Sequence, residues 1–121
     1  MIESEEFLEI IESLLDEIPE EFYKELSGGV RVLDEPKISQ HAINNDLVTL
    51  GEYHHEAVLG SHIVIYYGSF ERIYGNLSKE NLKKQVRKTL RHEFRHHLER
   101  LSGIRDLELE DAIQIAEYLK K

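Results

Sequence analysis

The residues of this chain best suited to chemistry are two histidines four positions apart, with a glutamate directly after the first. His92-Glu93-Phe94-Arg95-His96 has the pattern H-E-x-x-H. On a helix, positions i and i+4 lie on one face, so the two imidazoles can hold a single Zn²⁺. A glutamate beside them can deprotonate a metal-bound water. The pattern therefore predicts a zinc site with His92 and His96 as ligands and Glu93 as the general base.

The residues around the motif predict the helix that must position it. Ser78 is the expected N-cap, and Ser102-Gly103 is expected to end the helix after about residue 101. At about 100° per residue, Glu93 falls between the histidine pair and an apolar stripe. We therefore expect the histidines beside the core face and Glu93 partly buried. The apolar stripe consists of Val86, Leu90, Phe94 and Leu101.

Other polar residues have simpler explanations than a role in the site. His97 falls inside the apolar stripe, where we expect a core histidine that is hydrogen-bonded to backbone. His54-His55 follows a strand and predicts a surface pair. Tyr66 and Tyr67 point to opposite faces of a strand, so one of them could donate a hydrogen bond in the site.

A basic stripe on the same helix predicts a solvated face, partly paired with glutamates such as Glu99. A phosphate-binding role is the alternative interpretation. The stripe consists of Lys84, Arg87, Lys88, Arg91 and Arg95.

Composition bounds the class of protein. With 121 residues, 40% of them hydrophobic, the chain fits one domain over 1–121. Without cysteine, a metal must be held by histidine and carboxylate. A net charge of −9 argues against general affinity for nucleic acid or for anionic membranes. The acidic start and the lack of a long apolar run predict a soluble cytoplasmic protein.

The remaining segments predict a small sheet packed with helices. Ser4 is the expected cap of a first helix that Pro19 ends, and a short second helix is expected over 20–26. Strands are expected at 30–33, 47–53 and 62–67, a loop at 37–45 and a helical turn at 69–74. A last helix is expected over about 107–119. This order predicts an α+β fold.

The run H-E-F-R-H-H at 92–97 resembles the signature of the zincin-like metallopeptidases, in particular a small bacterial family of minimal zincins. Residues 16–22, 63–70 and 87–91 also look like that family. The resemblance implies a short mixed sheet, an active-site helix and a following helix. It also implies zinc peptidase chemistry with ligands His92 and His96 and base Glu93. An extended peptide or protein substrate would pair with the sheet edge.

The third metal ligand is where the chain departs from the family pattern. Many members resemble H-E-x-x-H-H-F-G-x-x-D, and Ser102 stands here at the aspartate position. A similar G-x-x-D tail ends at Asp106, displaced by about one helical turn, or roughly 6 Å. Asp106 is the first candidate, ahead of Glu110 and Glu117. Glu99 shares the histidine face, but three ligands along one straight helix cannot converge on one ion.

Three functions from different classes follow. The first is a zinc-dependent peptidase. The second is a zincin-fold metal-binding or interaction module with little or no proteolysis, suggested by the small chain and the displaced third ligand. The third is a metal-dependent RNA hydrolase, suggested by the basic stripe. Ser102 argues against it, because the bacterial rRNA-maturation endonucleases have a third histidine at that position. The sequence leaves the substrate and the oligomeric state open.

Overall fold

The main sheet of the protein has three strands in the order β1-β5-β4. A computed structural model describes residues 2–44, 47–103, 111 and 114. Strand β1 (Gly29–Leu33) pairs parallel with β5 (Gly60–Tyr66), and β5 pairs antiparallel with β4 (Gly51–Glu56). The register places Tyr53 opposite Ile63 and His54 opposite His62. The sheet is therefore short and mixed, with β4 at its edge.

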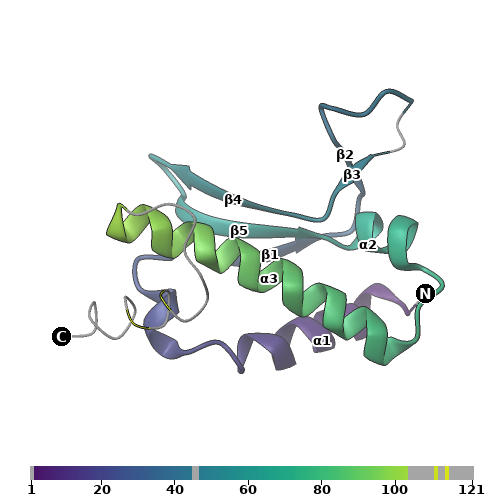
Figure 1. Ribbon diagram of the computed structural model, residues 1–121, viewed down its shortest axis with the longest axis horizontal. Coiled ribbons are helices and arrows are strands. Elements are labelled where there is room, and N and C mark those ends of the chain that lie inside the picture. Colours follow the sequence, from purple (N-terminus) through teal and green to yellow (C-terminus); the bar gives the residue numbers. More distant parts are fainter. Residues whose placement is uncertain (1, 45–46, 104–110, 112–113, 115–121) are drawn as a thin grey trace.

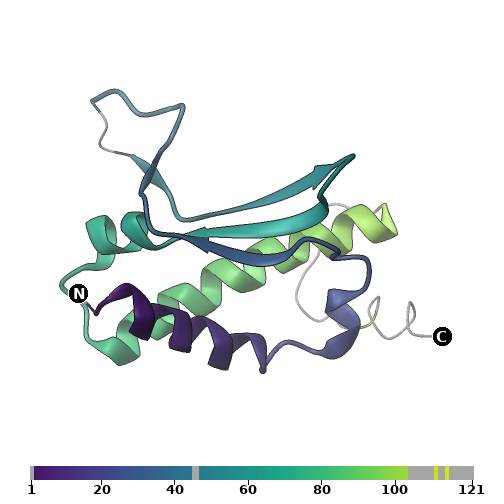
Figure 2. The same cartoon turned by 180° about the vertical axis from the view of Figure 1, so that it is seen from behind.

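Two long helices lie on the same side of this sheet. Helices α1 (Ser4–Leu15) and α3 (Lys79–Ser102) run beneath it, as Figures 1 and 2 show from opposite sides. Helix α3 packs against both β4 and β5. The arrangement confirms the predicted α+β class. The helix expected over 107–119 lies outside the described residues except at 111 and 114. No described helix is long and apolar enough to cross a membrane.

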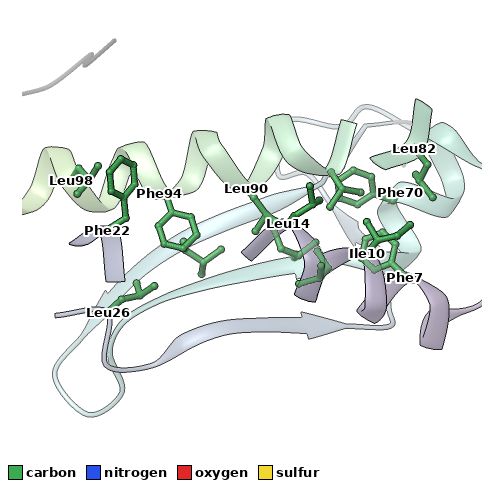
Figure 3. Close-up of a cluster of buried hydrophobic side chains, with 14 residues drawn as sticks. Phe7, Ile10, Leu14, Phe22, Leu26, Phe70, Leu82, Leu90, Phe94 and Leu98 are labelled. Atoms are coloured by element: carbon green, nitrogen blue, oxygen red, sulfur yellow. The ribbon is translucent and has the colours of Figure 1, made fainter. Parts of the chain in front are cut away.

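One apolar cluster joins the sheet to both helices (Figure 3). Ile63 and Ile65 alternate along β5 and are fully buried on the face toward the helices. Burying each such side chain contributes roughly 1.5–3 kcal/mol, which fixes α3 under the sheet. On α3 the predicted stripe is confirmed except at its end, where Leu98 is buried and Leu101 only half-buried. The buried stripe residues are Leu82, Val86, Leu90, Phe94 and Leu98.

Helix α3 begins and ends where the sequence predicts. The Ser78 side chain accepts a hydrogen bond from the Asn81 N–H at 3.2 Å. Gly103 has φ 75°, in the left-handed region that suits glycine, and its N–H donates to the Glu99 carbonyl at 2.8 Å. Both ends are thus fixed, and the register of the helix sets the direction of every side chain in the motif.

The first helices differ from the prediction. Glu3, not Ser4, occupies the N-cap of α1, and Ser4 is already helical. The backbone therefore enters the helix one residue earlier than Ser4 capping requires. The predicted second helix is only the four-residue 3-10 helix η1 (Glu20–Tyr23). Lys24 is extended there, and Glu25 has a positive φ, so the helix cannot continue.

The strands also differ in their bounds. The predicted loop at 37–45 contains β2 (Lys37–Ile38), which pairs antiparallel with β3 (Val48–Thr49) to form an arm beside the main sheet (Figure 1). Strands of two residues are too short to show the alternating sequence pattern from which strands are predicted. The single strand expected over 47–53 is therefore divided, and β4 continues to Glu56. Helix α2 (Tyr67–Tyr74) begins two residues before the predicted turn, which removes Tyr67 from the strand.

Candidate metal centre

The two histidines predicted as metal ligands meet at the surface of α3. His92 Nε2 and His96 Nε2 are 3.0 Å apart. Two nitrogens bound to one tetrahedral zinc, each at about 2.0–2.1 Å, would be roughly 3.3–3.4 Å apart. The pair would need to open by only a few tenths of an ångström, and imidazole nitrogen is a donor that suits zinc. The two residues therefore fit the ion that the motif implies.

The Nδ1 atoms of His92 and His96 have partners of opposite charge. His96 Nδ1 lies 2.9 Å from Glu99 Oε1. His92 Nδ1 lies 3.3 Å from Arg95 Nη2. Each partner stands three positions after its histidine on the same helix. Glu99 therefore orients His96.

The basic stripe finds its carboxylate partner outside α3. Both Glu17 oxygens accept hydrogen bonds from Arg87, at 2.9 and 3.1 Å. Arg91 Nη2 is 3.8 Å from Glu17 Oε1. Part of the stripe is thus neutralised by the segment after α1, which weakens the case for phosphate binding. The sequence could not show this contact, because 70 positions separate Glu17 from Arg87.

Glu93 is buried beside the pair, with only 6% of its surface exposed. Burial and then the negative charge of Glu52 raise the pKa of Glu93 to about 7, against the opposing charge of Arg95. A carboxyl with this pKa takes up and releases a proton near neutral pH. Its place between the histidines and the core is the place predicted from helical geometry.

Glu52 of β4 is a charged residue of the site that sequence reasoning missed. Its carboxylate accepts hydrogen bonds from Lys37 Nζ at 2.6 and 2.7 Å, from the Tyr66 hydroxyl, and from His54 Nε2 at 3.3 Å. Burial alone would raise the pKa of Glu52, but these donors hold it below its usual range. Two carboxyls of one site, Glu52 and Glu93, therefore have pKa values driven in opposite directions.

The two tyrosines at the end of β5 differ in what they reach. The Tyr66 hydroxyl donates to Glu52 and so joins the site. The Tyr67 hydroxyl donates to the Ile2 carbonyl at 2.6 Å, near the start of α1. Burial, followed by the hydrogen bond to Glu52, raises the pKa of Tyr66. The sequence did hold a signal for Glu52. If the predicted strand is continued to residue 56, alternation places positions 52 and 54 on the same face of it.

His97 is a core histidine, as predicted. It is fully buried, with Nε2 2.7 Å from the Lys24 carbonyl and Nδ1 2.6 Å from the Tyr53 hydroxyl. Arg100 Nε donates in turn to that hydroxyl at 2.9 Å. Burial lowers the pKa of His97. Because a carbonyl only accepts, Nε2 is the donor and Nδ1 the acceptor, and both nitrogens are occupied by protein groups.

A cleft of about 770 Å³ opens between α3 and β4. In the part of the chain that the structure describes, β5 is the only sheet partner of β4. Among these residues, the outer backbone groups of β4 therefore have no strand partner, as at the edge of a sheet. His54, expected at the surface, is half-buried at this cleft and stacks on His62 with ring centroids 5.2 Å apart. The cleft is lined by Glu52, Tyr53, His54, Glu93, His96, Glu99, Arg100 and Gly103.

The three predicted third ligands, Asp106, Glu110 and Glu117, lie outside the described residues. Ser102, at the position where the family pattern has aspartate, donates from its hydroxyl to the Glu99 carbonyl at 3.4 Å. Among residues 2–44, 47–103, 111 and 114, no group of three His, Cys, Asp or Glu side chains could hold one metal ion. The described residues thus supply two candidate ligands and a base.

A helix that carries two facing histidines and a buried glutamate, under the edge of a small mixed sheet, defines a zincin-type protein. The model of the zincin-like metallopeptidase family matches residues 30–114, and the chain belongs to this family. The matched segment contains the main sheet from its second residue onward and the whole H-E-x-x-H helix. Family membership accounts for the fold and for the class of site, and such proteins are typically zinc-dependent.

A solved structure shares this fold. It is a conserved hypothetical protein from T. thermophilus, with 38% sequence identity and a TM-score of 0.70. The match covers 86% of this chain and 100% of that one. No curated protein matches the chain. The similarity thus extends beyond the motif to nearly the whole architecture, and the neighbour's description names no activity.

Proposed function

We propose that this protein is a zinc-dependent peptidase in which His92 and His96 hold the metal and Glu93 is the general base. One observation carries the proposal. Glu93 is buried, with its pKa raised to about 7, beside two imidazole nitrogens only 3.0 Å apart. Membership of the zincin-like family supports the same class of reaction. We propose Asp106 as the third ligand, ahead of Glu110 and Glu117.

The residues of the chain divide the chemistry between them. Zinc held by this pair would supply a Lewis acid that polarises the scissile carbonyl. Glu93 accepts the proton that the attacking water loses and passes it to the nitrogen of the leaving amine. Its raised pKa suits both steps near neutral pH, because the group must first bind the proton and then release it. Glu52 stays ionised and favours the protonated form of Glu93.

The proposed substrate is an extended segment of a peptide or protein. Its backbone would pair with the outer edge of β4 and so lie across the cleft between β4 and α3. Backbone pairing recognises any extended chain, so side-chain preference would come from the residues that line the cleft. Tyr53 and Arg100 are held in place there by the hydrogen bonds that lead to buried His97.

The test compares native protein with Glu93→Gln and with Glu80→Gln, which removes one charge from an exposed position in the first turn of α3. Zinc content is measured directly, and cleavage is followed by mass spectrometry on a mixture of unstructured peptides. We expect native protein and Glu80→Gln to bind zinc and cleave. Glu93→Gln should keep zinc and lose roughly 10²–10⁴ in rate. Zinc-loaded native protein without any cleavage would refute the peptidase proposal.

A metal-binding or interaction module without proteolysis is the second candidate. One observation favours it, since Ser102 stands at the position where the family pattern has an aspartate ligand. A structure of the zinc-loaded protein separates the two candidates. A third protein ligand together with peptide turnover supports the peptidase. An ion held by His92 and His96 alone, in a protein that turns over no peptide, supports the binding module.

A further inference from the structure

We propose that Arg95 opposes zinc binding, because it holds His92 in the imidazole tautomer whose Nε2 carries the proton. The inference rests on the proposed metal pair but not on peptide cleavage. It starts from the difference between the groups that contact Nδ1 of His92 and Nδ1 of His96. His96 Nδ1 contacts a carboxylate at 2.9 Å, whereas His92 Nδ1 contacts a guanidinium at 3.3 Å.

The partner of His92 fixes where its proton sits. A guanidinium has donors and no acceptor, so His92 Nδ1 must accept a hydrogen bond from Arg95 Nη2. A neutral imidazole carries one N–H, which must then be on Nε2. A protonated Nε2 has no lone pair for a metal. In this arrangement His92 is therefore not ready to be a ligand.

The partner of His96 has the opposite effect. The Glu99 carboxylate accepts, so His96 Nδ1 donates and Nε2 keeps its lone pair. That lone pair receives the N–H of His92 across the 3.0 Å contact. The three hydrogen bonds thus run in one direction, from Arg95 through His92 and His96 to Glu99. Their mutual consistency fixes the tautomers of both rings.

Zinc binding reverses this arrangement at His92. The proton on Nε2 must go to water, and Nδ1 must take one from water, so the net charge of the ring is unchanged. The new Nδ1–H then faces the N–H groups of Arg95, and two donors without an acceptor repel. Arg95 must therefore move away. Within the described part of the chain its Nε is buried without a hydrogen-bond partner, so this movement sacrifices no hydrogen bond at that atom.

Substitutions at 95 and 99 should act in opposite directions on zinc affinity. Arg95→Glu places a carboxylate three positions after His92, the spacing that Glu99 has from His96. Outer partners of metal-bound histidines typically change affinity by about 10–100-fold. We therefore expect Arg95→Glu to tighten zinc binding by about tenfold or more, and Arg95→Met by less. Glu99→Gln should weaken it by about 10–100-fold.

Arg91 provides the matched control, because it lies one turn earlier on α3 and contacts Glu17, not a histidine. Arg91→Glu and Arg91→Met remove the same charge as the two Arg95 variants. Zinc dissociation constants of all full-length variants are measured by competition with a chromophoric chelator. Nitrogen-15 NMR of the metal-free protein reports the tautomers directly, and circular dichroism checks that each variant is folded.

The expected result is a proton on His92 Nε2 and on His96 Nδ1, with tighter zinc binding in the Arg95 variants than in their Arg91 counterparts. A proton on His92 Nδ1 in the native protein overturns the inference. So does an equal change of zinc affinity in the Arg95 and Arg91 variants. Protein that shows the expected tautomers and affinities but cleaves no peptide refutes only the peptidase proposal.

Discussion

His96 and His97 are neighbours in the chain, yet they lie in different regions of the molecule. His96 borders the cleft, with one ring nitrogen bonded to Glu99 and the other facing His92. His97 is fully buried, and protein groups occupy both of its nitrogens. The comparison shows that a histidine can serve a metal only where the fold leaves a nitrogen within reach of the ion. Position on the helix decides this, because one residue turns the side chain by about 100°.

Removal of His96 should have the largest effect on the metal site. We expect His96→Ala to weaken zinc binding by more than about 1000-fold, since even outer partners change affinity by up to about 100-fold. The melting temperature of metal-free protein should hardly change, because the side chain is partly exposed. Chelator competition and thermal melts measure the two effects. Zinc affinity within about tenfold of native would remove His96 from the ligand set.

His97→Ala should show the opposite pattern. The change leaves a cavity in the core and deprives the Lys24 carbonyl and the Tyr53 hydroxyl of a partner. We expect a loss of about 3 kcal/mol in the free energy of unfolding, measured by urea denaturation of metal-free protein. Zinc affinity of the folded fraction should stay within a few-fold of native. A strong loss of affinity at full stability would contradict the core assignment.

The pH dependence of stability should distinguish Glu93 at the cleft from a residue of the core, and Glu93→Gln tests this. Because the pKa of Glu93 is raised to about 7, the folded state binds this proton more tightly than the unfolded state does. Glu93 therefore costs stability as pH rises from its usual pKa of 4.5 toward 7, and the cost is constant above that. With chelator present, Glu93→Gln should be more stable than native by about 3 kcal/mol at a pH of roughly 8.5.

The stabilisation in Glu93→Gln should fade as the pH is lowered to about 5, where native Glu93 is protonated in the folded state. Urea denaturation at several pH values follows the difference. Glu80→Gln, at an exposed site on the same helix, is the control for the loss of one negative charge. A difference between native and Glu93→Gln that is independent of pH would mean that Glu93 is not held in a desolvated site.

Local patterns predicted the parts of the fold that rest on local physics. The stripe of α3, its caps at Ser78 and Gly103, and the buried strand β5 all follow from periodicity and turn chemistry. The arm of β2 and β3 did not, because two-residue strands exist only through their pairing. The edge strand β4 was predicted to end too early, since an edge tolerates polar residues that otherwise indicate a loop.

The residues of the site also differ in whether local patterns could predict them. Helical spacing alone brings His92 and His96 together and places Glu93 toward the core. The contribution of Glu52 depends on Lys37 and Tyr66 from other strands, which no spacing rule joins. Glu99 was recognised on the histidine face, but its contact with His96 was not predicted. The proposed third ligand, Asp106, follows Gly103, and helical geometry does not determine the course of the chain there.

The edge strand β4 also has a consequence for how copies of this protein behave in concentrated solution. An unpaired edge can add a strand from any neighbour, including another copy, and so begin aggregation. Four of the six residues of β4, besides Gly51 and Tyr53, are glutamate or histidine. Carboxylates of two copies would face each other across such a pairing and repel. Self-association along this edge is therefore opposed by the negative charge of Glu52, whose pKa the surrounding donors hold below its usual range.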